Sequence, residues 1–257
     1  MFSSSNRHRH KVTLGLLLAG SLALAACGAS DSTGGTGTSG TGDAAAEGQW
    51  PRTFTNADGT TTEIPAEPEQ ILSTSVTVTG TLLSIEAPVT ASGSGGDGKF
   101  FAQWADVAQE RGVENVWSAG SVDLEAVYAQ DPDLIVVASS GRDSATDQLA
   151  EFQKVAPTIV VDYGGQSWQD LAAELGTATG LEDAAQATVR KFDDHVAEAA
   201  GRITVPEGTA NIIAYNGPGE ANQIARKGSA QGDVLEGLGF TLEDPNPDWH
   251  IQPQQRA

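Results

Sequence analysis

Cysteine is nearly absent from this chain of 257 residues, which contains Cys27 and no other. A single cysteine excludes an intramolecular disulfide and any metal site built from several thiolates. Histidine is also scarce, since there are four in the chain and two of them, His8 and His10, stand in its first ten residues. A His-rich site of the kind that holds a bare zinc or manganese ion is therefore not expected, and neither is a cofactor.

Positive charge is scarce as well. Lys and Arg number 14 against 34 Asp and Glu, and the net charge is -20. Such an acidic chain is unsuited to nucleic acid or to anionic lipid headgroups as partners. The sequence also lacks the spacings of a catalytic Ser-His-Asp set, G-x-S-x-G or H-E-x-x-H. The neighbouring Asp193 and Asp194 would point apart on a helix, so we expect no enzyme.

The longest uncharged apolar run, residues 12–26, has the length of a secretion signal and not of a membrane span, which needs about 20 residues. A basic leader with Arg7, Arg9 and Lys11 precedes it. The sequence therefore predicts a signal peptide over residues 1–26. Its removal leaves eleven Lys and Arg residues and makes the net charge three units more negative.

Cys27 follows the signal directly, in the order Leu24-Ala25-Ala26-Cys27-Gly28. This order resembles the bacterial lipobox, which implies lipid on the Cys27 thiol and an anchor on the extracytoplasmic face of the cell membrane. The alternative is ordinary secretion, with cleavage at the small residues Ala23 and Ala25 and a free thiol. Residues 27–49 are rich in Gly, Ser and Thr, which predicts a flexible tether spanning about 25 Å.

From Trp50 onward, short apolar runs alternate with amphipathic ones. A hairpin is expected over residues 52–65 with Asp58-Gly59 in its turn. Strand-like runs lie at 70–75, 87–93, 133–140 and 157–164, and helix-like runs at 78–87, 99–112, 121–130, 145–156 and 167–180. Ser121 or Asp123 would cap the third of these helices. This alternation predicts an α/β class with an open, mostly parallel sheet.

A longer helical period follows at about residues 181–204, with a buried stripe predicted at Ala184, Ala187, Phe192, Val196 and Ala199. A second α/β unit begins after Pro206, with a strand at 210–217 and a helix at 230–240. The segment from Thr241 has no regular pattern.

This order of elements resembles the substrate-binding lipoproteins of iron-siderophore and cobalamin ABC importers. The resemblance covers about residues 66–250 and is carried by SVDLEAVYAQDPDLIVV, LAEFQKVAPTIVVDYG and LAAELGTATGLEDAAQATVRKFDDHV. It implies the periplasmic-binding-protein fold, in which two α/β lobes joined by one rigid helix clasp a ligand. The expected segments are an N-terminal lobe at 50–180, a connecting helix at 181–204 and a partial C-terminal lobe at 205–257.

The second lobe of that family is about as long as the first, whereas about 50 residues follow Pro206 here. A piece of that size buries little surface by itself. We expect a second lobe that lacks several strands; the alternative is a natural one-lobe variant docked on the long helix.

A glycine-rich stretch, GSGGDGKF, imitates a phosphate-binding loop. Gly93, Gly95 and Gly98 have the G-x-G-x-x-G spacing, but Phe100 stands where a P-loop needs Ser or Thr after Lys99. We interpret it as a flexible loop at the end of a strand, which is also where ligands bind in open α/β sheets.

Three cations fall on loops after strands: Lys99, Arg142 and Arg226. Ferric siderophores of the catecholate type are polyanions with aromatic faces, so their site needs fixed positive charge and aromatic walls. These three cations are candidates for ligand binding, and exposed surface charge is the alternative for each.

Trp104, Tyr163 and Tyr215 are the aromatic candidates for the same site, although the spacing of Phe101 and Trp104 suits a helix core equally well. Ser73, Ser75, Ser139 and Ser140 also end strands; each is a candidate hydrogen-bond donor or a helix cap.

The resemblance further implies that Glu125 pairs with an arginine of the ABC permease, although a glutamate in the first turn of a helix needs no partner. The expected function is capture of a ferric siderophore by a monomeric, membrane-anchored protein for delivery to that permease. Haem or cobalamin is the alternative ligand. A non-transport surface lipoprotein and an exported hydrolase are the alternatives from other classes.

Overall fold

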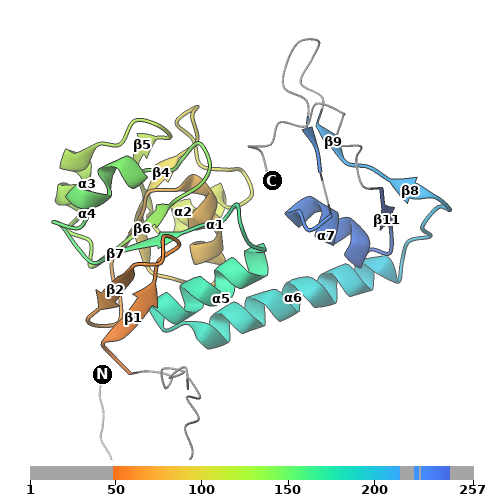
Figure 1. The fold of residues 1–257 in the computed structure, drawn as a ribbon, viewed down its shortest axis with the longest axis horizontal. Coiled ribbons are helices and arrows are strands. Elements are labelled where there is room, and N and C mark those ends of the chain that lie inside the picture. Colours follow the sequence, from red (N-terminus) through yellow and green to blue (C-terminus); the bar gives the residue numbers. More distant parts are fainter. Residues whose placement is uncertain (1–48, 215–222, 226, 244–257) are drawn as a thin grey trace, which may run out of the picture. The chain divides into compact units, whose positions relative to one another are not determined.

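The computed structural model describes residues 49–214, 223–225 and 227–243 (Figure 1). Residues 1–48, which include Cys27, lie outside the described residues, and so do Tyr215 and Arg226. The segment boundaries given above therefore stay predictions. Within the described ranges, no helix combines the length and hydropathy needed to cross a bilayer.

The predicted hairpin is confirmed. Strands β1 (Arg52–Thr55) and β2 (Thr61–Ile64) pair antiparallel. In the turn, Gly59 has a φ of 82°, a conformation that glycine adopts without strain. Asp58 accepts hydrogen bonds from the Thr60 backbone nitrogen at 2.9 Å and from its hydroxyl at 2.6 Å, which stabilises the turn.

Five parallel strands form the central sheet in the order β5-β4-β3-β6-β7, so the predicted α/β class is confirmed. They are β3 (Ile71–Ser73), β4 (Val89–Ser94), β5 (Glu114–Ser118), β6 (Leu134–Ala138) and β7 (Thr158–Val161). The sequence did not predict β5. This strand lies at the edge of the sheet with Glu114 and Asn115 exposed, so it lacks the apolar run that marks a buried strand.

Helices cover both faces of this sheet (Figure 1). Leu134 and Val136 of β6 belong to a core shared with α1 (Val76–Ser84) and α5 (Trp168–Thr179). Ile135 and Val137 belong to a second core shared with α3 (Leu124–Gln130) and α4 (Leu149–Phe152). Since successive side chains of a strand point to opposite faces, β6 is buried on both sides as predicted.

Side-chain caps fix the starts of these helices. Ser75 accepts from the Val78 nitrogen to cap α1, and Ser167 accepts from the Asp170 nitrogen to cap α5. Of the two caps proposed for α3, the structure uses Asp123, which accepts from the nitrogens of the second and third residues after it. The Ser121 hydroxyl donates to the Ser118 carbonyl instead.

Two helices are shorter than their sequence patterns. Helix α2 (Ala105–Glu110) begins only after a turn at residues 102–104, so Lys99 lies on a loop. The pattern at 145–156 divides into a 3-10 turn (Thr146–Gln148) and the single turn of α4. Both segments have the periodicity of a helix. In each of them the chain also has to turn toward the next strand, and this turn shortens the helix.

Helix α6 (Glu182–Ala200) confirms the predicted long helix, but the predicted stripe is wrong at Ala187, which is exposed. The one buried residue of α6 is Ala185. A Cβ placed on Gly176 of α5 would lie 2.9 Å from the Ala185 Cβ. Gly176 thus lets α5 and α6 approach closely. This contact places Ala185, and not Ala187, on the buried face of α6.

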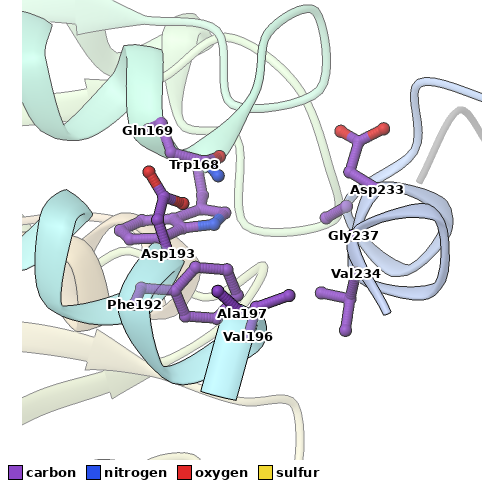
Figure 2. A pocket seen from close by; sticks show the side chains of 10 residues that line it. Trp168, Gln169, Phe192, Asp193, Val196, Ala197, Asp233, Val234 and Gly237 are labelled. Atoms are coloured by element: carbon purple, nitrogen blue, oxygen red, sulfur yellow. The ribbon is translucent and has the colours of Figure 1, made fainter. Parts of the chain in front are cut away.

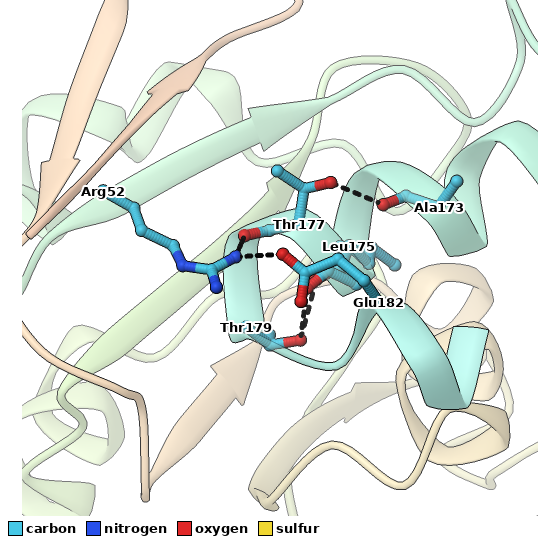
Figure 3. A network of polar contacts seen from close by, with 7 residues as sticks. Arg52, Ala173, Leu175, Thr177, Thr179 and Glu182 are labelled. Atoms are coloured by element: carbon cyan, nitrogen blue, oxygen red, sulfur yellow. Dashed lines mark hydrogen bonds and ion pairs between the residues drawn. The ribbon is translucent and has the colours of Figure 1, made fainter. Parts of the chain in front are cut away.

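The buried Arg52 joins the hairpin to the α5–α6 junction (Figure 3). Its Nη1 donates to the Thr177 carbonyl, near the end of α5, at 2.6 Å and forms an ion pair with Glu182, the first residue of α6. The guanidinium also lies 4.7 Å from the centre of the Trp50 ring. One cation therefore contacts the negative end of one helix and an acid in the first turn of the next.

Beyond α6, the predicted strand at 210–217 is wrong as a continuous element: β8 (Thr209–Ala210) and β9 (Ile213–Ala214) are separate. The first pairs in parallel with β11 (Thr241–Leu242), where no regular structure was expected. The second pairs antiparallel with β10 (Gln223–Ile224). The predicted helix is present as α7 (Ala230–Gly237).

Candidate functional site

The order of the strands indicates where at the edge of the sheet a ligand is expected. From β3 the chain proceeds through α1 to β4 on one side, whereas β6 and β7 lie on the other side. The carboxyl ends of β3 and β6 are neighbours at the point where the direction of winding reverses. Open α/β sheets bind their ligands at such a point. The residues that follow these two strands, together with those that follow β4 and β7, form what we call the strand-end site.

The buried carboxylate of Asp143 organises the strand-end site. Its Oδ2 accepts from the Ser75 hydroxyl at 2.6 Å and from the Thr77 backbone nitrogen at 3.2 Å, and its Oδ1 accepts from the Tyr163 hydroxyl at 2.7 Å. Asp143 is 6% exposed. These donors come from the segments after β3 and β7, so one charged group connects three strand ends through short, charge-assisted bonds.

Tyr163 lies across the loop that follows β6. A Cβ on Gly141, whose φ is 86°, would lie 1.5 Å from the Tyr163 hydroxyl oxygen. Only glycine leaves room for the phenol at this place. Burial and the hydrogen bond to Asp143 raise the pKa of Tyr163 well above its usual range. The phenol therefore stays protonated, with its hydrogen committed to Asp143.

The strand-end serines differ in their roles. Ser75 is both cap and donor, since its oxygen accepts from Val78 and its hydrogen goes to Asp143. Ser73 and Ser139 donate to the carbonyls of Ser75 and Val161, and Ser140 accepts from the Gly164 nitrogen. The hydroxyl of the buried Thr74 has no hydrogen-bond partner among the described residues.

Two of the predicted cations lie on exposed loops at this edge of the sheet. Lys99 closes the glycine-rich loop, where its carbonyl accepts from the Gly95 nitrogen at 2.8 Å. No helix begins at that loop, in agreement with the rejection of a P-loop. Arg142 is exposed next to Asp143. Neither side chain forms an ion pair with any described residue, which leaves both available to an anion.

Trp104 belongs to the core, the alternative that the sequence left open. It is 9% exposed, its ring centre lies 4.8 Å from that of Phe100, and it covers Gly80 of α1, where a Cβ would lie 2.9 Å from the indole. Phe101 is 41% exposed, so it is the more accessible aromatic residue of this loop. Sequence spacing did not separate the two because their loop is not helical.

Glu125 lies in the first turn of α3 and is exposed, with its backbone nitrogen bound to Asp123. Its pairing with a permease arginine stays a prediction, as do the roles of Cys27, Tyr215 and Arg226 outside the described residues. No group of three or more potential metal ligands occurs in the part of the chain that the structure describes.

Sequence reasoning missed Asp143 and Arg52. The loop SSGRDS drew attention to Arg142, although an acid that follows a buried strand by a few residues is also a signal for a strand-end site. Arg52 stands two positions before the apolar Phe54 on β1, so both side chains lie on the same face of the strand, and that spacing indicates that Arg52 points inward.

A five-stranded parallel sheet covered by helices and followed by the long helix α6 is the first lobe and connecting helix that the sequence resemblance implies. The chain belongs to the periplasmic binding protein family, whose model matches residues 71–245.

Individual relatives agree with this assignment. The chain is 40% identical over 200 residues to the ferric enterobactin-binding periplasmic protein FepB of Escherichia coli, covering 75% of this chain and 62% of FepB. It is 28% identical to the probable siderophore-binding lipoprotein YfiY of Bacillus subtilis, covering 74% and 57% of the two chains. The crystal structure of holo-ViuP superimposes with a TM-score of 0.76 at 51% identity, covering 78% of this chain and 68% of ViuP.

The chain spans about three fifths of the length of the curated relatives it matches. One of these relatives is named as a periplasmic protein and the other as a probable lipoprotein.

Proposed function

We propose that this protein captures a ferric siderophore outside the cytoplasm and delivers it to an ABC permease. The observation that carries the proposal is the match to the periplasmic binding protein family together with 40% identity to a protein named for binding ferric enterobactin. Membership in a family of binding proteins also supports the expectation that the chain is not an enzyme.

The chemistry of the strand-end site supports an anionic, aromatic chelate as ligand. Lys99 and Arg142 offer positive charge that forms no ion pair with the described residues, and Phe101 and the ring of Tyr163 offer aromatic surface. The Tyr163 hydroxyl is hydrogen-bonded to Asp143, so the residue offers its ring and not a free oxygen to a ligand. Iron would instead arrive already chelated, as the catecholate hypothesis requires, and the protein would recognise the outer surface of the chelate.

The membrane partners are part of the same proposal. Cys27 would carry the lipid anchor, and Glu125, exposed on α3, would pair with an arginine of the permease. The name of one relative, a probable siderophore-binding lipoprotein, supports the role of Cys27.

Tryptophan fluorescence tests the ligand. The chain from residue 28 onward keeps all five tryptophans and would be titrated with ferric catecholate, ferric hydroxamate, haem and cobalamin. We expect saturable quenching by the ferric catecholate, weakened in the Lys99→Ala and Arg142→Ala variants and unchanged in Lys191→Ala on α6. Saturation by haem or cobalamin alone would assign the alternative ligand.

Absence of quenching from a folded sample would contradict binding by this chain. The same titration on the chain extended by the remaining C-terminal residues of FepB would then show whether the proposed class of ligand is wrong as well.

A further inference from the structure

Three aromatic side chains meet around the loop that follows β4. The ring centre of Trp104 lies 4.8 Å from that of Phe100 and 6.5 Å from that of Phe101, and the planes of Trp104 and Phe101 meet at 66°. Aromatic pairs prefer such tilted and edge-to-face arrangements, with centres about 4.5–7 Å apart. Both phenylalanines are therefore held by contact with Trp104.

Trp104 packs on α1 at a place that only glycine leaves open. A Cβ on Gly80 would lie 2.9 Å from both Cδ1 and Nε1 of the indole, closer than carbon atoms pack without strain. The indole is 9% exposed and belongs to the core shared with α1. Gly80 therefore sets how closely Trp104 approaches the helix, and this position determines where Phe101 can lie.

Phe101 is the accessible ring of this group. It is 41% exposed, and it lies against the glycine-rich loop, because a Cβ on Gly95 would lie 3.7 Å from the Phe101 Cε1 atom. The same loop carries Lys99, whose side chain forms no ion pair with any described residue. A ring supported from below and a cation thus stand two positions apart after the carboxyl end of β4.

We infer that Trp104 is a positioning residue for siderophore binding, which holds Phe101 as the contact that selects a catecholate over a chelate without rings. The inference rests on the proposed function and assigns the residues that determine its substrate class. A side chain on an unsupported loop would lose conformational freedom when a ligand binds. The contact with Trp104 restricts Phe101 beforehand, so less affinity is lost to ordering.

A second pair of rings serves as an independent reference. Trp168 on α5 and Phe192 on α6 meet edge to face, with centres 4.9 Å apart, in a pocket of about 240 Å³ between α5, α6 and α7 (Figure 2). The resemblance places the ligand between the two lobes, so this pocket belongs to the same proposed function. Its rings stand on other elements than the group around Trp104, and a change at Gly80 should leave them in place.

Gly80→Ala tests the support without altering a residue that faces the ligand. Isothermal calorimetry on the chain from residue 28 would measure affinity for a hexadentate ferric tris-catecholate and for ferric citrate, an anionic chelate without rings. We expect Gly80→Ala and Phe101→Leu each to weaken catecholate binding by about fivefold and to leave the affinity for ferric citrate unchanged. Gly201→Ala, at the end of α6, is the matched control, because a Cβ there would meet no atom closer than 3.6 Å.

A rescue variant separates positioning from general damage. In the Gly80→Ala background, Trp104→Phe supplies a smaller ring that has room to move away from the new methyl group, and it should recover most of the lost affinity. Near-ultraviolet circular dichroism of the ligand-free protein should change in Gly80→Ala and return toward the parent spectrum in the double variant.

Double-mutant cycles identify the residue through which Gly80 acts. The effect of Gly80→Ala on affinity should disappear in the Phe101→Leu background and persist in the Phe192→Leu background. Additive effects of Gly80→Ala and Phe101→Leu would overturn the inference. Unchanged catecholate affinity in Gly80→Ala, or equal losses for the catecholate and for citrate, would overturn it too.

The failure of the inference differs from that of the proposed function. Catecholate binding that survives in every variant would count against Trp104 and leave the proposed function standing. A parent chain that binds no ferric chelate would contradict the proposed function, and the inference would fall with it.

Discussion

Three hydrogen-bond donors surround the buried carboxylate of Asp143. An unpaired carboxylate would be costly there, and each hydrogen bond to a charged group contributes about 1.5–3 kcal/mol. The same bonds hold the Tyr163 ring and the start of α1 in fixed positions. We therefore regard Asp143 as a positioning residue that shapes the strand-end site from beneath.

Replacement of Asp143 by Asn keeps its size and removes its charge. The new amide group cannot accept from both Ser75 and Tyr163, so we expect the free energy of unfolding to fall by about 2 kcal/mol. We also expect weaker siderophore binding. Denaturant unfolding and fluorescence titration would measure the two effects, with the exposed Asp147→Asn as control.

A double-mutant cycle with Tyr163→Phe separates positioning from general damage. If Asp143 acts through Tyr163, removal of the phenol should have little further effect on affinity in the Asp143→Asn background. Additive effects on affinity would contradict that role.

Glu174 on α5 gives a prediction for pH. Burial raises the pKa of its carboxyl, and the charge of Asp162 adds to this, while the hydrogen bond from Gln166 opposes it. The folded state therefore takes up a proton before the unfolded state as the pH falls. Glu174→Gln should be more stable than the parent at neutral pH, and the difference should shrink as the pH falls through the raised pKa.

Urea unfolding between pH 7 and pH 4 would test this, with the exposed Glu110→Gln of α2 as control. A stability difference that does not change with pH would contradict the assignment.

Local signals account for the residues that the sequence predicted well. The helix cap formed by Ser75 and the Asp58-Gly59 turn each join residues only a few positions apart in the chain. Their roles can therefore be inferred from neighbouring residues. Asp143 and Trp104 depend on partners 20 or more positions away, at Ser75, Tyr163 and Gly80. No pattern along the chain shows which of two nearby aromatic residues turns inward.

At the scale of elements, the α5–α6 junction depends on one cation. The Arg52 side chain is 3% exposed, yet its Nε and Nη2 have no hydrogen-bond partner among the described residues. Its stabilisation comes from Nη1, which contacts Thr177 and Glu182 (Figure 3). The guanidinium also lies over the Trp50 ring. Loss of either partner would leave a buried charge poorly compensated.

We expect Glu182→Ala to lower the free energy of unfolding by about 3 kcal/mol. This is the lower end of the cost of breaking a buried ion pair, because the Glu182 side chain is 25% exposed. Asp183→Ala removes the next acid of the same first turn, which is exposed, and should cost less than 1 kcal/mol. Chemical denaturation would compare them, and equal losses would show that helix-dipole effects dominate over the ion pair.

Elements with strong periodicity were predictable, and those shaped by the sheet were not. The buried run of β6 and the long period of α6 gave clear patterns. The edge strand β5 and the single turn of α4 owe their conformation to the strands and cores they join. The face of α6 was misassigned at Ala187 because the close contact between Gly176 and Ala185 decides it, and neither residue stands out in the sequence.

At the scale of the whole molecule, charge opposes the proposed function. A chain with a net charge of -20 repels an anionic chelate at long range, and only short-range cations such as Lys99 and Arg142 attract it. Specific capture must then rest on contacts made after the encounter, while the field slows the encounter itself.

Ionic strength distinguishes the two contributions. From about 10 mM to about 100 mM salt the Debye length falls from about 30 Å to about 10 Å, which screens the distant acids before the contacts within the site. We expect the association rate of a ferric catecholate, measured by stopped-flow quenching, to rise a few-fold over this range. A ferric hydroxamate without net charge should show no change. An association rate that falls with salt would contradict this expectation. It would mean that the attraction exerted by Lys99 and Arg142 extends beyond the acidic surface. The Lys99→Ala and Arg142→Ala variants should then lose the salt dependence of the rate.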